Sequence, residues 1–198
     1  MTLADRITLL RVILAPIFFA LYFSTMRFPE WAMTNAIWIV ALLWLLFLAA
    51  EITDGLDGMV ARRLNQTSDF GRLFDPFADT IVQLTFFLCF VLDGIFPAAL
   101  FLVVIYREFG ILFVRNLMLK KGVTMGARMS GKVKTVAYIV ACSVAMTYAS
   151  LVRLDIEILA FLTPVFGVGS VAVFAVSVVF SVVSFFDYVS IYRKAKAV

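Results

Sequence analysis

Four aspartates lie at the junction of two strongly apolar segments of the chain: Asp54, Asp57, Asp75 and Asp79. Residues three or four apart share one face of a helix, so each pair of aspartates would line one helical face. If the two helices form a hairpin, both faces can point at one cavity. Carboxylates that lie this close repel one another unless a cation compensates their charge. Because hard divalent cations prefer oxygen ligands, the spacing predicts a metal site.

Small residues and one arginine are interleaved with the aspartates: Gly58, Ala61, Arg62 and Gly71. Glycine and alanine leave room for a ligand to approach the backbone. An arginine can hold a phosphate through two parallel hydrogen bonds. Breaking a diphosphate requires charge neutralisation on both phosphoryl groups, which two metal ions about 3.5–4 Å apart can supply. Four carboxylates are enough to bridge two ions, so the residue types suit a nucleotide-diphosphate site.

The aspartates have two other interpretations. A solvated acidic helix end would need no ligand, but acidic residues in or near a membrane span are costly and are usually functional. A divalent-cation transporter would account for the carboxylates, but it would not account for Gly58, Arg62 and Gly71 at fixed offsets. We therefore favour the diphosphate site and keep cation transport as the alternative from another class of protein.

The complete pattern covers residues 54–79 and reads Asp54-x2-Asp57-Gly58-x2-Ala61-Arg62-x8-Gly71-x3-Asp75-x3-Asp79. It resembles, without departure, the signature of the CDP-alcohol phosphotransferase family. The resemblance implies a membrane enzyme that displaces CMP from a CDP-activated lipid. It assigns metal binding to the four aspartates, and general-base catalysis to Asp79. It assigns the CDP group to Asp54, Gly58, Ala61, Arg62 and Gly71.

The composition places this pattern in a membrane protein. Of the 198 residues, 64% are hydrophobic and only 15% are charged, against roughly 25% charged residues in soluble domains. The chain has no histidine, which excludes histidine acid–base catalysis and histidine-liganded zinc. Cys89 and Cys142 lie inside apolar runs without disulfide or metal spacing, so we expect both to be packing residues. We expect a single membrane domain over residues 1–198.

Apolar runs and turn residues predict an all-α fold with an N-terminal amphipathic turn and six transmembrane helices: residues 3–24, 36–64, 69–92, 97–120, 130–151 and 160–192. We expect Arg11 at the level of the lipid headgroups and Trp31 in an interfacial loop. The second helix would be about 43 Å long at 1.5 Å per residue, longer than a hydrocarbon core of roughly 30 Å. Its last turns, which carry Asp54 to Arg62, should therefore reach the interface or protrude.

Six spans would put both termini on one side of the membrane. Of the 17 lysine and arginine residues, only Arg27 and Arg153 fall in the loops of the other side. Cytoplasmic loops are rich in lysine and arginine. We therefore expect both termini and the aspartates at the cytoplasmic face, where CDP-linked metabolites are available.

A second polar group is basic and lies in the predicted fourth and fifth helices. Arg107 and Arg115 are eight residues apart and share a helical face, and Lys134 lies early in the next helix. A cation in or at the edge of an apolar helix is costly unless it is paired. We therefore predict that these three residues bind the phosphate of an acceptor, although Glu108 could instead pair with Arg107 or Arg115. We expect Lys120, Lys121 and Arg128 to be ordinary basic residues of a cytoplasmic loop that lie close to anionic lipid headgroups.

Within the family, the tract 61–79, the pair Arg107-Glu108 and the segment 130–135 resemble bacterial phosphatidylglycerophosphate synthases. The chain departs from them at Thr80 and Tyr138, where lysine and glutamine are more usual. The resemblance implies transfer of the phosphatidyl group from CDP-diacylglycerol to sn-glycerol 3-phosphate, with release of CMP. Another acceptor of the same chemistry, inositol phosphate, inositol or serine, is the alternative. The cationic group favours a phosphorylated acceptor.

The same resemblance implies the cofactors, partners and location of the protein. It implies Mg²⁺ or Mn²⁺, with two ions, as the cofactor. It implies a homodimer among membrane lipids, with no nucleic acid as a partner. It also implies a multi-pass protein of the bacterial inner membrane, with the active site facing the cytoplasm.

Overall fold

The computed structural model describes residues 3–64, 69–120 and 129–196, with their side chains except those of residues 3–5, 54–70, 72–73, 119–120, 130 and 194–196. Every regular element in these ranges is a helix, which confirms the predicted all-α class for them. The elements are α1 (Leu3–Arg27), α2 (Pro29–Thr34), α3 (Ala36–Leu64), α4 (Asp69–Leu92), α5 (Ala98–Lys120), α6 (Met129–Leu154), a 3₁₀ turn (Glu157–Leu159) and α7 (Leu162–Lys196).

The long helices follow the apolar runs of the sequence closely. α3 and α4 have the predicted bounds, whereas α1, α6 and α7 each continue for three or four residues beyond the predicted end. The short helix α2 lies in a segment that we expected to be a loop. Its first residue is Pro29, which suits the first turn of a helix because its ring fixes φ and it has no N–H to satisfy. Trp31 on α2 is exposed.

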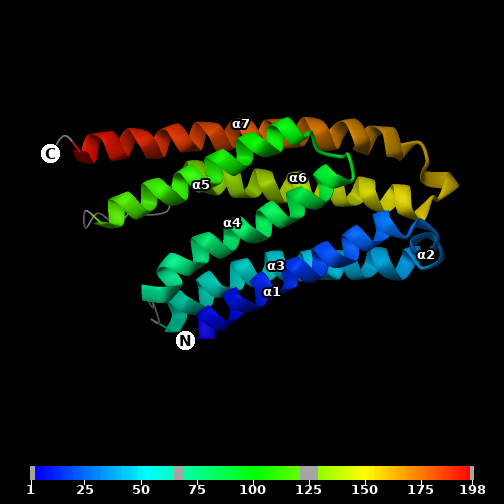
Figure 1. Cartoon of the computed structure of the whole chain (residues 1–198), viewed down its shortest axis with the longest axis horizontal. Coiled ribbons are helices and arrows are strands. Elements are labelled where there is room, and N and C mark those ends of the chain that lie inside the picture. The colour runs from blue at the N-terminus through cyan, green and yellow to red at the C-terminus, as the bar shows by residue number, and fades with distance from the viewer. Residues whose placement is uncertain (1–2, 65–68, 121–128, 197–198) are drawn as a thin grey trace.

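The long helices α1 and α3–α7 lie side by side in one elongated bundle, and α2 covers one end of it (Figure 1). α1 packs against both α3 and α4, while α7 packs against both α5 and α6. Contacts of α3 with α6, and of α4 with α5, join these two groups. The first described turn of α1 and the last of α7 lie at the same end of the bundle.

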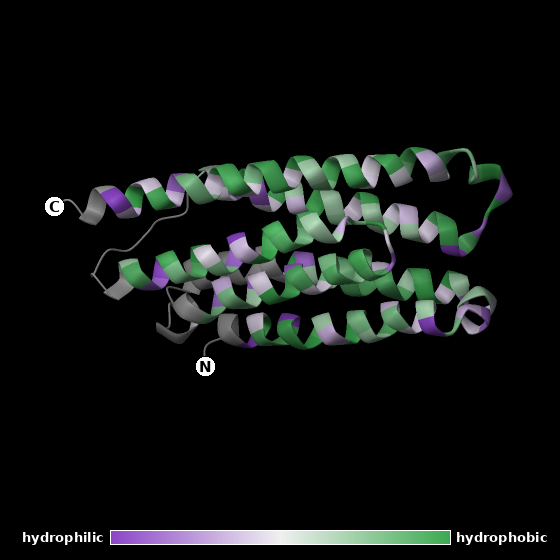
Figure 2. Ribbon diagram, turned by 45° about the horizontal axis from the view of Figure 1, so that its top comes forward, coloured by the Kyte–Doolittle hydropathy of each residue, from purple (hydrophilic) through white to green (hydrophobic). Residues whose placement is uncertain are grey.

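Within the described part of the chain, five helices are long and apolar enough to cross a membrane, in α1, α3, α4, α6 and α7. Figure 2 shows that hydrophobic residues cover most of the length of the long helices. α5 was predicted as a span too, but Arg107, Glu108 and Arg115 fall within any 18-residue stretch of it. The structure therefore supports a membrane protein with five apolar spans, and a sixth span stays a prediction.

The middle of the bundle is held by contacts between aromatic rings. Phe86 of α4 packs edge-on against Phe18 of α1 and Phe47 of α3, with ring centroids 4.8 and 5.3 Å apart. On the other side, Phe87 contacts Phe174 of α7 at 5.0 Å. Each such pair contributes about 0.5–1.5 kcal/mol beyond the area that it buries. Because these rings come from four helices, they fix how the two helix groups meet.

Small residues let α7 approach its neighbours closely. Four serines on one side of this helix are fully buried: Ser170, Ser177, Ser181 and Ser184. Small side chains at helix interfaces are typical of membrane bundles, because close backbone approach replaces the missing hydrophobic drive between helices. The two cysteines, Cys89 and Cys142, are also buried and unpaired with each other, which agrees with the predicted packing role.

A polar cluster ties three helices at the end of the bundle where α4 turns into α5. Tyr22 of α1 donates a 2.7 Å hydrogen bond to Oδ2 of Asp93, directly after α4. Arg153 of α6 donates to the same oxygen at 3.0 Å and to Oγ1 of Thr25 at 2.9 Å. Its guanidinium also lies 4.5 Å from the centroid of the Tyr22 ring. These contacts attach both α1 and α6 to the end of α4.

Candidate active site

The structure places the eight signature residues on two consecutive helices. α3 carries Asp54, Asp57, Gly58, Ala61 and Arg62 in its last turns, as predicted, and α4 carries the remaining three. The side chains of the α3 residues lie outside the described part. On α4, Gly71 is buried, Asp75 is half-buried and Asp79 is exposed. α1 packs against both helices, and it therefore forms a third wall beside the aspartates.

Two polar residues of α1 contact the α4 aspartates. Thr8 donates a hydrogen bond from Oγ1 to Oδ1 of Asp75 at 3.1 Å. Arg11 donates from Nη2 to Oδ1 of Asp79 at 2.6 Å, which makes a charge-assisted ion pair. The side chain of Arg11 is only 2% exposed, whereas that of Asp79 is 53% exposed. Arg11 therefore faces the interior of the bundle and belongs to the site, a role that the sequence analysis did not give it.

A spacing signal in α1 could have identified these two residues. Thr8 and Arg11 belong to a run of positions three or four apart whose side chains are all buried: Thr8, Arg11, Ala15, Phe18, Tyr22 and Thr25. Residues with this spacing share one helical face. Because the rest of the run packs against other helices, an arginine in register with it is also expected to face the bundle.

A cavity of about 260 Å³ opens beside Asp79. Its wall brings Asp79 together with all three cations of the predicted acceptor site, Arg107, Arg115 and Lys134. These residues come from α4, α5 and α6, and the sequence separates Asp79 from each of the three cations by 28 residues or more. One member of the predicted aspartate group thus shares a cavity with the whole of the predicted basic group. Asp79 and the three cations therefore border the same space, and the part that the cations line is its basic end.

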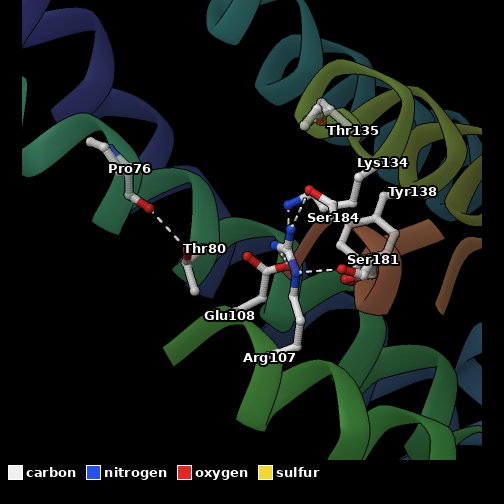
Figure 3. Close-up of polar contacts among 10 residues, drawn as sticks. Pro76, Thr80, Arg107, Glu108, Lys134, Thr135, Tyr138, Ser181 and Ser184 are labelled. Carbon is white, nitrogen blue, oxygen red and sulfur yellow. Dashed lines mark hydrogen bonds and ion pairs between the residues drawn. The ribbon is translucent and has the colours of Figure 1, made fainter. Parts of the chain in front are cut away.

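Glu108 neutralises part of the basic end. Its Oε1 accepts hydrogen bonds from Nη1 of Arg107 at 2.7 Å and from Nζ of Lys134 at 3.1 Å (Figure 3). Arg107 also donates from Nε to the carbonyl of Ser181 and from Nη2 to Ser184, both on α7. The pairing of Glu108 with Arg107 was one of the sequence alternatives, and its pairing with Lys134 was not foreseen. Arg107 is therefore held in place by contacts with α5 and α7 before any ligand binds.

Arg115 differs from the other two cations. Its guanidinium lies over the ring of Tyr188, 5.7 Å from the centroid. Among the described residues, it has no hydrogen-bond or ion-pair partner. The exposed Lys132 lines the same cavity. The donors of Arg115 are therefore available to an anion that enters the cavity, and the net charge of this end is positive even with Glu108 included.

Several polar residues of the cavity wall were not predicted as site residues. Gln83 lies one helical turn beyond Asp79 on the same face of α4, and its amide nitrogen donates to Sγ of Cys142 at 3.3 Å. Glu51, one turn before Asp54 on α3, lines the cavity as well. Thr80 also lines the cavity, and its hydroxyl group donates a hydrogen bond to the carbonyl oxygen of Pro76. The spacing of Glu51 and Gln83 from the signature aspartates is a signal that could have identified them, whereas only the packing of the helices identifies Thr80.

The donor chemistry of the site fits a hard divalent cation. The four signature aspartates offer carboxylate oxygens, and the chain has no histidine to attract zinc. Carboxylate sites suit Mg²⁺ and Mn²⁺. Among the described side chains, no group of three or more candidate metal ligands is present. The predicted set depends on Asp54 and Asp57, whose side chains are outside that description.

Comparison with known proteins shows the family of the chain. The family profile described as CDP-alcohol phosphatidyltransferase matches residues 1–183. A Treponema pallidum protein named CDP-diacylglycerol–glycerol-3-phosphate 3-phosphatidyltransferase is 38% identical over 192 residues, covering 95% of this chain and 88% of its own length. A Bacillus subtilis protein of the same name is 32% identical over 190 residues, covering 95% of this chain and 93% of its own length. The chain therefore belongs to the CDP-alcohol phosphatidyltransferase family.

Proposed function

We propose that this protein transfers the phosphatidyl group of CDP-diacylglycerol to sn-glycerol 3-phosphate and releases CMP. The observation that carries the proposal is the cavity that Asp79 shares with Arg107, Arg115 and Lys134. A carboxylate at one end can accept a proton from a hydroxyl group, and cations at the other end can bind a phosphate. The names of the Treponema and Bacillus relatives support the same reaction.

The acceptor phosphate would bind at the basic end of the cavity. Arg115 would supply open guanidinium donors, which suit a phosphate because they can bind two of its oxygens at once. Lys134 and Arg107 would add positive charge from positions fixed by Glu108. The cavity of about 260 Å³ is smaller than the roughly 300–1,000 Å³ of drug-sized ligand sites. It therefore suits a small polyol phosphate, and the diacylglycerol chains would lie elsewhere.

The CDP group would lie along the signature residues of α3 and α4. Gly58, Ala61 and Gly71 would allow the nucleotide and its diphosphate to approach the helix backbones. Arg62 would pair with a phosphate, and Asp54 would contact the CDP group as well as the metal. This arrangement would place the diphosphate beside Asp79 and next to the acceptor cavity.

The proposed transfer is a displacement at phosphorus. Asp79 takes the proton of the free hydroxyl of the acceptor, and the resulting oxygen attacks the lipid-side phosphorus. A new phosphorus–oxygen bond forms as the bond to the bridging oxygen of the diphosphate breaks, so CMP leaves with that oxygen. Two Mg²⁺ or Mn²⁺ ions held by Asp54, Asp57, Asp75 and Asp79 would neutralise the charge of the diphosphate.

We place the protein in the bacterial inner membrane with α5 as a sixth span and the site at the cytoplasmic face. The distribution of lysine and arginine supports this orientation. The common end of α1 and α7 in Figure 1 agrees with an even number of spans. Charges in α5 would be compatible with a span because Arg107 and Glu108 are buried and paired inside the bundle. The homodimer stays a prediction.

The reaction can be tested with purified protein in detergent. CMP release from CDP-diacylglycerol should require both a divalent cation and an acceptor. An acceptor panel of glycerol 3-phosphate, inositol 1-phosphate, inositol and serine should show turnover with glycerol 3-phosphate. Preference for inositol 1-phosphate would correct the acceptor but keep the chemistry. Metal flux in proteoliposomes without any CMP release would refute the enzyme hypothesis and support the alternative of a divalent-cation transporter.

A further inference from the structure

The two contacts from α1 to the aspartates form a matched pair. Thr8 and Arg11 are three residues apart on α1, and Asp75 and Asp79 are four apart on α4. Among the described side chains, Thr8 contacts Asp75, and Arg11 contacts Asp79. Since both spacings correspond to about one helical turn, two consecutive turns of one helix contact two consecutive turns of the other.

From this pairing we propose that Arg11 and Thr8 are positioning residues of the metal site. They hold the carboxylates of Asp79 and Asp75 in the orientation in which these groups bind the divalent cation. The inference rests on the proposed function in one respect, because it takes these two aspartates as metal ligands. It adds a third helix, α1, to a site that the signature motif assigns to α3 and α4 alone.

Burial supports a specific role for Arg11. A cation that is 2% exposed has lost its hydration, and such a loss costs several kcal/mol unless a partner compensates it. Its partner Asp79 is more than half exposed and lines the cavity together with Arg11. The arginine is thus fixed by the bundle, while the carboxylate that it holds faces the ligand side. An arrangement with a rigid donor behind an accessible carboxylate orients that carboxylate for binding.

Support of this kind has a known scale in metal sites. Carboxylates that bind metals are usually hydrogen-bonded by neighbouring groups, and loss of such a group typically costs 10–100-fold in metal affinity or activity. Arg11 makes a short charge-assisted contact, so its loss should fall toward the upper part of this range. Thr8 donates a longer hydrogen bond of 3.1 Å from an uncharged hydroxyl group, so its loss should reduce metal affinity less than the loss of Arg11 does.

The bundle offers a matched control for Arg11. Arg153 is also a largely buried arginine that pairs with an aspartate of another segment, Asp93, at 3.0 Å. It lies at the end of the bundle where α6 finishes, away from the cavity. Replacing Arg153 by glutamine removes a comparable interhelical ion pair without touching the aspartate site. Any effect of losing an ion pair on general stability should therefore be seen in this variant too.

The experiment measures Mn²⁺ binding to Arg11→Gln, Arg11→Lys, Thr8→Val and Arg153→Gln in detergent by electron paramagnetic resonance, without substrate. We expect about 10–100-fold weaker Mn²⁺ binding in Arg11→Gln, a smaller loss in Thr8→Val, and partial recovery in Arg11→Lys. Arg153→Gln should bind Mn²⁺ like the unaltered protein. The Mn²⁺ concentration for half-maximal CMP release should shift in the same order.

Two results would overturn the inference. One is unchanged Mn²⁺ binding in Arg11→Gln and Thr8→Val, and the other is an equal loss in Arg11→Gln and Arg153→Gln. If Arg11→Gln does not fold, Arg11→Lys and Thr8→Val still decide the question. If the unaltered protein binds Mn²⁺ but releases no CMP, the proposed reaction fails while the positioning role can still be measured.

Discussion

Replacing Glu108 by glutamine should leave two cations of the cavity without their counter-ion. The Glu108 side chain is almost fully buried and accepts from both Arg107 and Lys134 through one oxygen. Glutamine has nearly the same shape as glutamate, but its side chain is uncharged. Its amide group also adds N–H donors that would face the N–H donors of Arg107 and Lys134. Breaking a buried ion pair by removing one partner costs about 3–5 kcal/mol. We expect Glu108→Gln to lower the free energy of unfolding by this amount.

Phosphate should stabilise the Glu108→Gln variant more than the unaltered protein. A bound anion replaces the missing negative charge, whereas in the unaltered protein it must share Arg107 and Lys134 with Glu108. Ligand at 100 times its Kd adds about 2.7 kcal/mol of stability, so saturating phosphate should restore much of the loss. Unfolding in one detergent, with and without inorganic phosphate, measures both effects. Glu157→Gln, at an exposed site, is the control and should change stability by less than about 0.5 kcal/mol.

Two results would refute this reasoning. If Glu108→Gln is as stable as the unaltered protein, the carboxylate is not a counter-ion to Arg107 and Lys134. If phosphate stabilises both proteins equally, the anion does not bind at these cations. Either result would also remove the structural support for placing the acceptor phosphate at this end of the cavity.

Four further substitutions test other parts of the structure. Asp79→Asn should abolish CMP release while CDP-diacylglycerol binding is largely kept, and retained turnover would remove Asp79 as the base. Arg115→Ala and Lys134→Ala should each raise the KM for glycerol 3-phosphate more than the KM for CDP-diacylglycerol, and equal effects on both would argue against an acceptor role. Asp93→Asn should lower the free energy of unfolding by roughly 1.5–3 kcal/mol through its weakened bond to a buried arginine. The exposed Asp155→Asn is its control, and equal stability of the two variants would show that the Asp93 cluster contributes nothing.

The helices were predictable because apolar runs and polar turns alternate clearly in this sequence. The bounds of α3 and α4 follow from two apolar segments separated by the polar residues 65–68. The signature residues on these two helices follow from their fixed spacing. The short helix α2 was not predictable in this way, because Pro29 permits a helix start as readily as a turn. Local signals therefore determine where helices are, but not which ones meet.

The sequence predicts site residues where they have a characteristic spacing along one helix or where a charge lies in an apolar helix. The three cations were singled out because charges in apolar helices need partners, and the structure does bring them into one cavity. The partners of Glu108, which are Arg107 and Lys134, could not be chosen from sequence alone, since Arg107 and Arg115 were equally good candidates. Arg11 was assigned to the headgroups because an arginine near the start of a span often lies there. Its spacing from Ala15 and Phe18 indicates a side chain that faces the bundle, but its partner Asp79 depends on how α1 packs against α3 and α4.

The polar contacts of α1 explain how the aspartates keep their places in an apolar bundle. Lipid tails are as apolar as the helix surfaces, so apolar packing alone discriminates weakly against one helix sliding past another. α1 contacts α4 through Arg11 and Asp79 near one end and contacts Asp93 through Tyr22 near the other. A slip of one turn, about 5.4 Å, would break both contacts at once. The Tyr22–Asp93 hydrogen bond and the Arg11–Asp79 ion pair therefore support the same register of α1 against α4.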